Sequence, residues 1–186
     1  MSKKGKTSEQ SFRLLRTKLN VPRLHPDVVD RSWLIRRLNE GLSRKLIVVS
    51  APAGSGKTTL LSAWVEQCHF PVAWVSLDRR DNDPVRFWAY LITALQSLAP
   101  GAGAATLDML QSPQPVPIEV AFTELVNELD AIQEDFILVL DDYHVVETQD
   151  IHTGLTFLIE NLPGSMHLVI AGRSDPALPL PQYRAR

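Results

Sequence analysis

One short stretch combines the residue types that bind phosphate. It follows an apolar run and is close to the pattern G-x-x-x-x-G-K-[ST], with Ala51 in place of the first glycine. In this pattern backbone N–H groups surround a diphosphate, the lysine reaches the terminal phosphates, and the hydroxyl ligates magnesium. An alanine fits the first position where its φ angle is negative. The sequence therefore predicts a phosphate loop with Thr58 as a magnesium ligand. The predicted nucleotide-binding residues are Ala51, Pro52, Ala53, Gly54, Ser55, Gly56, Lys57, Thr58 and Thr59.

Two carboxylates end another apolar run, in the stretch FILVLDDYH. At the carboxyl end of a central parallel strand, acidic side chains lie beside a phosphate loop on the neighbouring strand. We expect Asp141 to complete the magnesium site or to bond Thr58. Asp142 is placed to polarise an attacking water, which makes it a predicted catalytic residue together with Lys57. The alternative is that the two acidic residues only end a strand.

A third apolar run ends at Arg173, in the stretch LVIAGRSDP. An arginine at this point could contact the γ-phosphate and stabilise charge in the transition state, so Arg173 is the third predicted catalytic residue. The alternative is a surface arginine paired with Asp175.

Other conspicuous residues are predicted to be structural. The aspartates at 78, 81 and 83 lack the glycine and the glutamate of a calcium loop. The histidines lack zinc-ligand spacing, and His144 is interpreted only as following the acidic pair. Four tryptophans are predicted to lie in the core, namely Trp33, Trp64, Trp74 and Trp88.

Alternating strands and helices must position these residues. Apolar runs predict strands at 45–51, 72–77, 136–142 and 167–173. Helical periodicity predicts helices at 30–43, 57–68, 83–99, 118–132 and 150–163. Asp30 and Asp83 are the expected N-caps of two of them. The stretch 100–117 is predicted to be a long loop with about one helical turn, and the chain is expected to end without a closing helix. These repeated units predict an α/β fold with helices on both faces of a parallel sheet.

Length and composition favour one globular domain. The chain has 186 residues, and we expect a polar flexible tail at 1–17 and a single domain at 18–186. It contains no apolar run long enough for a membrane span and no signal sequence, which predicts a cytoplasmic protein. Residues 1–50 carry 12 Lys/Arg against 4 Asp/Glu. This basic part could bind DNA directly, but no recognition motif supports that interpretation, and a solvated surface is favoured.

Five segments are informative when taken together. They are TKLNVPRLHPDVVDR, VVSAPAGSGKTTLLSAW, VAWVSLDRRDNDPVRFWAYLITAL, LVLDDYHVV and LVIAGRSDPALPLPQYRAR. In this order they resemble the nucleotide-binding domain of MalT-like, large LuxR-type bacterial transcriptional activators, a branch of the STAND class of P-loop NTPases. The resemblance implies a three-layer P-loop NTPase sandwich with about five parallel strands that binds ATP or ADP with Mg²⁺. It also implies that Arg31 lies near the adenine, although Asp30 replaces the glycine that often precedes this arginine.

The resemblance further implies a switch module with weak ATP hydrolysis. Relatives continue with a winged helix, a sensor domain and a helix-turn-helix, so we expect this chain to be truncated before them and to reach DNA only through the missing helix-turn-helix. Nucleotide-dependent self-association and contacts with those domains are the other expected interactions. The alternative is a stand-alone ATP-driven enzyme, either an AAA+-like ATPase or a small kinase. No substrate lid is evident for a kinase, and the strand ends in Asp-Asp where AAA+ proteins have Asp-Glu.

Overall fold

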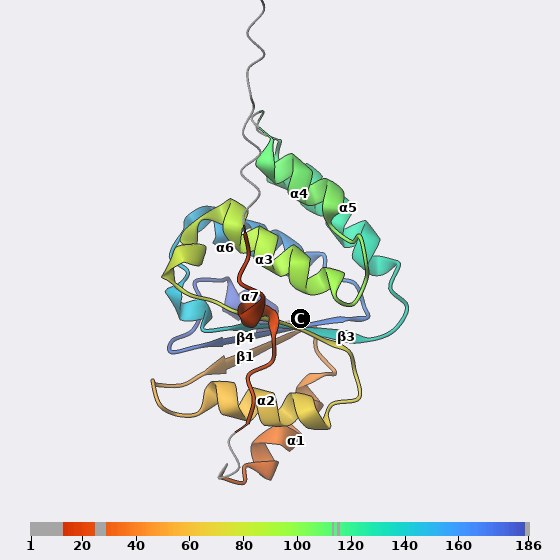
Figure 1. Cartoon of the computed structure of the whole chain (residues 1–186). Coiled ribbons are helices and arrows are strands. Elements are labelled where there is room, and N and C mark those ends of the chain that lie inside the picture. Colours follow the sequence, from red (N-terminus) through yellow and green to blue (C-terminus); the bar gives the residue numbers. More distant parts are fainter. Residues whose placement is uncertain (1–12, 25–28, 113, 115, 185–186) are drawn as a thin grey trace, which may run out of the picture.

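The protein is a three-layer α/β sandwich around a parallel sheet (Figure 1). The structure is a computed structural model that describes residues 13–24, 29–112, 114 and 116–184. The strands are β1 (Leu46–Ser50), β2 (Val72–Ser76), β3 (Phe136–Asp141) and β4 (Met166–Gly172). The α-helices are α1 (Ser32–Gly41), α2 (Lys57–Gln67), α3 (Pro84–Gln96), α4 (Ala104–Gln111), α5 (Ile118–Asp130), α6 (Gln149–Glu160) and α7 (Leu180–Arg184). Three short 3₁₀ helices are η1 (Arg16–Leu19), η2 (Arg79–Asn82) and η3 (Tyr143–Val145).

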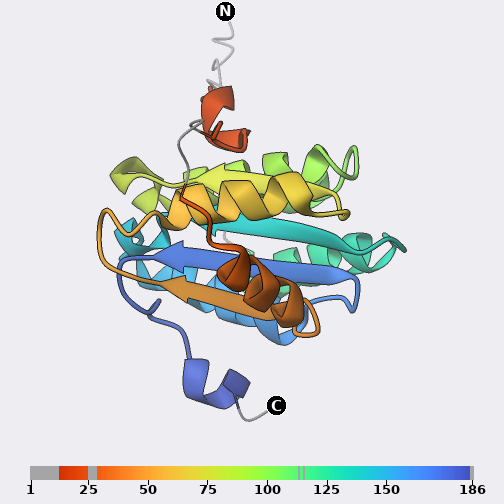
Figure 2. The ribbon, with the colours of Figure 1, turned by 90° about the horizontal axis from the view of Figure 1, so that it is seen from below.

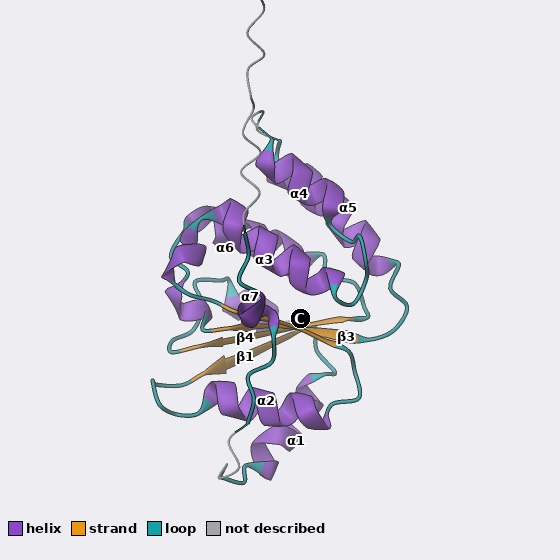
Figure 3. Cartoon of the chain, viewed as in Figure 1, coloured by secondary structure: helices purple, strands orange, loops and turns teal. Residues whose placement is uncertain are grey.

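The strand order is β1-β4-β3-β2, and all neighbouring pairs are parallel. The expectation of about five strands is therefore wrong for the described residues, which form four. Each of the four corresponds to one of the apolar runs in the sequence. Figure 3 shows helices on both sides of these strands, as expected for a sequence in which strands and helices alternate.

Two apolar clusters hold the layers together. On one face of the sheet, alternate strand residues such as Val75 and Leu138 pack against α3, α5 and α6. On the other face, Trp74 and Val139 pack against α1 and α2. Because side chains alternate along each strand, adjacent residues of one apolar run serve opposite layers. No helix in the described part of the chain is long and apolar enough to cross a membrane.

Of the two predicted N-caps, the structure confirms Asp83, whereas Asp30 is wrong because Arg31 is the N-cap of α1 and makes no side-chain cap hydrogen bond. The Asp83 side chain accepts a hydrogen bond from the Arg86 N–H at 2.8 Å, and Pro84 occupies the first turn of α3, as predicted. Helix α1 begins at Ser32, two residues later than predicted. Asp30 still accepts a hydrogen bond from the Ser32 N–H at 2.9 Å, just outside the helix.

Two of the predicted loops contain helices. Helix α4 takes up eight residues of the expected loop at 100–117, more than the one turn predicted there. Gly103 begins it in the left-handed region at φ 72°, and the Thr106 hydroxyl donates to the Ala121 carbonyl of α5. Near the end of the chain, the five residues of α7 form a closing helix that was not expected. Leu178 and Leu180 anchor it by packing against the larger core cluster.

Helix η1 lies beside β2, an edge strand of the described sheet (Figure 2). Leu14 and Leu19 pack against the core, and Lys18 is buried. Of the predicted tail at 1–17, residues 1–12 lie outside the described part, so the domain boundary stays a prediction. Trp33 was predicted to be a core residue, and this prediction is wrong: its side chain is 56% exposed, whereas the other three tryptophans are buried.

Candidate functional site

The phosphate loop connects β1 to α2 at the carboxyl end of the sheet. Ala51 continues the strand, since its N–H donates to the Gly172 carbonyl at 3.2 Å. Gly54 and Gly56 both adopt left-handed backbone, with φ angles of 75° and 78°, which glycine reaches without steric cost. Gly56 is also the N-cap of α2, so the loop leads directly into the positive end of a helix.

Lys57 is the first residue of α2 and is almost fully buried. Its ammonium donates to the carbonyls of Ala51 at 2.6 Å and Pro52 at 3.0 Å. The side chain therefore folds back over the loop that precedes it. The buried ammonium group and the N-terminal end of α2 together give this part of the molecule a local positive charge.

Thr58 and Asp141 meet across the sheet. The threonine hydroxyl donates to the Asp141 carboxylate, with 2.7 Å between Oγ1 and Oδ2. Asp141 is the last residue of β3 and is 2% exposed. Burial raises the pKa of this carboxyl above its ordinary value, while the Thr58 hydrogen bond and the Lys57 charge act in the opposite direction.

One expectation about these strands is wrong. The Asp141 strand was predicted to lie next to the phosphate-loop strand, but β4 lies between β1 and β3. Thr58 lies on α2, which packs across the sheet face, so its hydroxyl reaches β3 without direct strand pairing.

Asp142 leaves the sheet in an unusual conformation. Its φ of 58° is left-handed, and its N–H bonds the neighbouring Asp141 carboxylate at 3.0 Å. The Asp142 side chain is half-exposed, with Oδ1 at 3.7 Å from Nδ1 of His144. Partial burial lowers the pKa of His144, and the Asp142 charge opposes this effect.

His144 is thus a neighbour of Asp142 that was not predicted to belong to the site. The available signal was its position two residues after the acidic pair. A Cβ atom on Gly172 would lie 3.4 Å from the His144 N atom, so the ends of β3 and β4 are in close contact here.

The two arginines differ in how firmly they are held. Arg31 donates from Nη1 to the Ser55 carbonyl at 2.6 Å, so its guanidinium lies on the phosphate loop. Its predicted place near an adenine stays a prediction. Arg173 follows β4 and is exposed, although its charge is near enough to contribute to lowering the pKa of His144.

The three aspartates after β2 have structural partners. Asp81 is fully buried and pairs with Lys18 and with Arg86, whose Nε lies 3.0 Å from Oδ1. Asp78 and Asp83 accept hydrogen bonds from backbone N–H groups at the starts of η2 and α3. These contacts hold the turn after β2, which also bonds residues 145–148 through Asn82.

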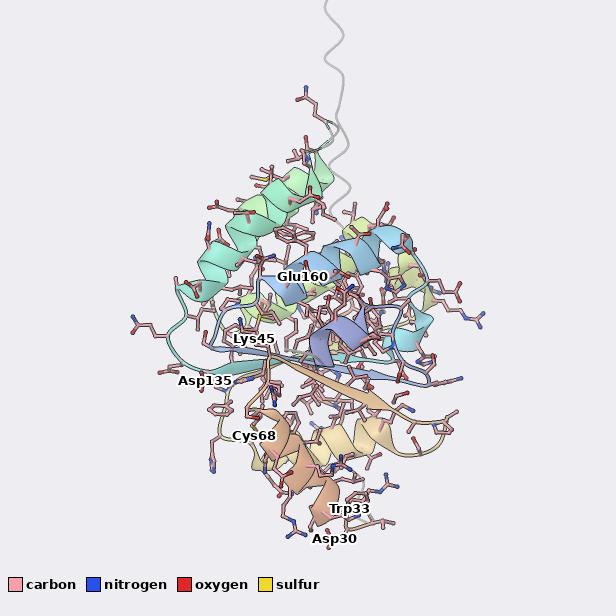
Figure 4. The ribbon with its side chains drawn as sticks, turned by 180° about the vertical axis from the view of Figure 1, so that it is seen from behind. Asp30, Trp33, Lys45, Cys68, Asp135 and Glu160 are labelled. Atoms are coloured by element: carbon pink, nitrogen blue, oxygen red, sulfur yellow. The ribbon has the colours of Figure 1, made fainter. Side chains whose placement is uncertain are left out.

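A hollow of about 720 Å³ lies elsewhere, at the opposite end of β1. Lys45, Glu160 and Tyr183 are among its lining residues, and none of the predicted site residues lines it. Figure 4 shows Lys45 and Glu160 in this region. The chemistry-bearing side chains gather instead at the carboxyl end of the strands.

Comparison with solved structures agrees with this architecture. The crystal structure of Cdc6p from Pyrobaculum aerophilum superposes with a TM-score of 0.53 and 20% identity, covering 89% of this chain and 44% of that chain. At this identity the likeness shows the fold alone. A parallel β1-β4-β3-β2 sheet with a phosphate loop after β1 makes the protein a P-loop NTPase-type domain of the α/β class.

Sequence comparison finds similar transcriptional regulators. The HTH-type transcriptional regulator MalT of Klebsiella pneumoniae subsp. pneumoniae is 35% identical over 173 residues, or 93% of this chain. MalT of Serratia proteamaculans is 33% identical over the same length. The chain spans about a fifth of the length of these curated relatives, 19% in each case. No family model matches the chain. These matches support the interpretation of the chain as a P-loop NTPase domain of a MalT-like regulator.

Proposed function

We propose that this domain is the ATP/ADP-binding switch module of a bacterial, signal-responsive transcriptional regulator, with slow Mg²⁺-dependent ATP hydrolysis. The observation that carries the proposal is the 2.7 Å hydrogen bond between Thr58 and Asp141, next to the buried ammonium of Lys57. Relatives named as HTH-type transcriptional regulators support the regulatory part. By the same analogy we propose a cytoplasmic location, contacts with further regulator domains, and nucleotide-dependent self-association.

The residues of the loop fit a polyphosphate. Lys57 is bonded to carbonyl oxygens of its own loop, and an anion can replace these weaker acceptors. Left-handed Gly54 and Gly56 turn the backbone, and α2 adds its N-terminal N–H groups. Arg31 adds a second cationic group at Ser55. Together these donors suit the negative charge of a nucleoside di- or triphosphate.

The donor set also fits Mg²⁺, which prefers oxygen ligands and takes few from protein when phosphates are bound. We propose that Thr58 and Asp141 hold the ion. When bound, Mg²⁺ would neutralise negative charge on the phosphates. Because burial raises the pKa of Asp141, a neighbouring cation would favour the ionised carboxylate.

We expect hydrolysis to be slow because the two proposed catalytic side chains beyond the phosphate loop, Asp142 and Arg173, are exposed to solvent. Asp142 is the proposed water-orienting residue, and its side chain is half-exposed. Arg173, the proposed γ-phosphate contact, is exposed at the end of β4. Charged groups stabilise a transition state less well in an exposed site than in one that excludes water, and a slow rate suits a domain whose bound nucleotide sets a state.

Calorimetry with ADP or ATP and Mg²⁺ tests the proposal. Lys57→Ala should weaken binding at least about tenfold, because a charged hydrogen bond to phosphate contributes about 1.5–3 kcal/mol. Lys45→Ala, a matched loss of charge at the other end of β1, should bind like the wild type. Asp142→Asn should keep binding and lose hydrolysis.

Two results would contradict the proposal. The first is no nucleotide binding by the wild type, and the second is equal binding by Lys57→Ala. Turnover at the rate of a typical enzyme, above about 1 s⁻¹, would favour the stand-alone enzyme over the switch.

A further inference from the structure

The turn after β2, residues 78–83, is held in a fixed shape. The Asp78 carboxylate accepts from the Arg80 N–H at 2.8 Å, and the Asp81 carboxylate accepts from the Asp78 N–H at 2.8 Å. Asp81 is fully buried and also pairs with Lys18 and Arg86. These contacts join the turn to the segment before α1 and to α3. These hydrogen bonds and ion pairs therefore hold the backbone of the next residue, Asn82, in a fixed position.

Asn82 reaches from this turn to the loop after β3. Its Oδ1 accepts from the N–H groups of Glu147 at 2.6 Å and Thr148 at 3.3 Å. Its Nδ2 donates to the Val145 carbonyl at 2.6 Å. The Thr148 hydroxyl donates back to the Asn82 carbonyl at 2.6 Å. One side chain and its backbone thus hold three residues of a loop more than sixty positions away in sequence.

The loop that Asn82 holds begins at Asp142. Within it, the Val145 N–H donates to the Asp142 carbonyl at 3.1 Å and the Val146 N–H donates to the Tyr143 carbonyl at 3.0 Å, which closes η3. The direction of Asp142 is set by its left-handed backbone, by the hydrogen bond from its N–H to the Asp141 carboxylate and by this short helix, which also carries the neighbouring His144. Because η3 continues into residues 145–148, the position of the Asp142 carboxylate also depends on how those residues are held.

We infer that Asn82 is a positioning residue for Asp142. It fixes the far end of the 142–148 loop and so keeps the Asp142 carboxylate aimed at the attacking water. The inference rests on the proposed function, in which Asp142 orients that water. Asn82 has no hydrogen bond to the phosphate loop, so it acts on turnover and leaves nucleotide affinity unchanged.

An asparagine suits this role because its amide both accepts and donates. Asn82→Asp keeps an oxygen for the N–H groups of Glu147 and Thr148 but cannot donate to Val145. Asn82→Ala loses all side-chain bonds. Asn161→Ala is the matched control, because Asn161 donates to the Phe157 carbonyl at 2.8 Å at the far end of α6, the helix that follows the loop.

Steady-state ATP hydrolysis and ADP calorimetry provide the first test. We expect kcat to fall about tenfold in Asn82→Ala, since small misplacements of a catalytic group cost up to about a hundredfold in rate. The ADP affinity should stay at the wild-type value, Asn82→Asp should have an intermediate kcat, and Asn161→Ala should match the wild type. Equal kcat values for Asn82→Ala and Asn161→Ala would overturn the inference.

Residue-resolved hydrogen exchange provides a test that needs no hydrolysis. In Asn82→Ala, the amides of Val145 and Val146 should exchange at least about tenfold faster, because the loop that protects them is released. The amides of α2 should be unchanged. If the wild type binds nucleotide without hydrolysing it, the hydrolytic part of the proposed function fails, and the exchange result alone decides whether Asn82 positions the loop. Unchanged exchange at Val145 and Val146 would refute the inference.

Discussion

Replacing Asp81 by alanine should destabilise the fold strongly. Asp81 is fully buried, and its carboxylate accepts hydrogen bonds from Lys18, Arg86 and the Asp78 N–H. Lys18 itself is 8% exposed and lies over the Tyr90 ring, with 4.5 Å from Nζ to the ring centroid. In Asp81→Ala, a buried ammonium and a partly buried guanidinium would lose their central counter-charge.

The expected cost can be bounded from these contacts. Removing one partner of a buried ion pair costs about 3–5 kcal/mol, since the other charge stays desolvated. Lys18 keeps a second, half-exposed carboxylate, because Asp78 Oδ2 lies 3.2 Å from its Nζ. We therefore expect a loss near the lower limit, about 3 kcal/mol. For a chain of this length, that loss lowers the Tm by about 6–12 °C.

Urea unfolding followed by tryptophan fluorescence measures this loss, because Trp64, Trp74 and Trp88 are buried. The control is Asp135→Ala, which removes an exposed carboxylate in the loop before β3 (Figure 4). It should change the free energy of unfolding by less than about 0.5 kcal/mol. A loss below about 1 kcal/mol for Asp81→Ala, or one equal to that of the control, would refute the buried-pair reasoning.

Three further predictions concern other parts of the chain. Gly154→Ala should lower the free energy of unfolding by about 1–3 kcal/mol in urea, because the new Cβ would lie 2.7 Å from Cζ2 of Trp88. Burial lowers the pKa of His152, so the unfolded state takes up its proton first, and stability should fall as the pH drops below about 6.5. In His152→Gln this contribution to the loss of stability should be absent when the free energy of unfolding is measured at several pH values. The same pH dependence in the wild type and the variant would contradict the prediction. Arg31→Ala should weaken ADP binding several-fold by calorimetry, because the loop loses the 2.6 Å bond to the Ser55 carbonyl. An unchanged ADP affinity would show that Arg31 does not contribute to nucleotide binding.

Much of the fold could be predicted because its signals are local. The apolar runs of the four strands and the Asp83-Pro84 start of α3 need only neighbouring residues for their interpretation. The approach of Thr58 to Asp141 was also predictable, because parallel strands end at the same edge of a sheet.

The features that could not be predicted from the sequence depend on contacts between residues far apart in the chain. Strand order is set by packing, so nothing local revealed that β4 separates β1 from β3. Helix α4 is fixed by contacts with α5, which override its weak periodicity. Asn82 contacts a loop that is distant in sequence, and a lone asparagine among aspartates gives no sign of this partner.

The left-handed backbone of Asp142 limits how this residue can be studied. It is the one non-glycine residue with a positive φ angle among those that the structure describes. Asparagine accepts this conformation readily, whereas most other side chains pay about 1–2 kcal/mol. An alanine scan would therefore mix the loss of a charge with a strained main chain. Asp142→Asn removes only the negative charge, and Asp142→Gly removes the whole side chain. Neither substitution strains the left-handed backbone, so a change in activity in these variants can be attributed to the missing side-chain group.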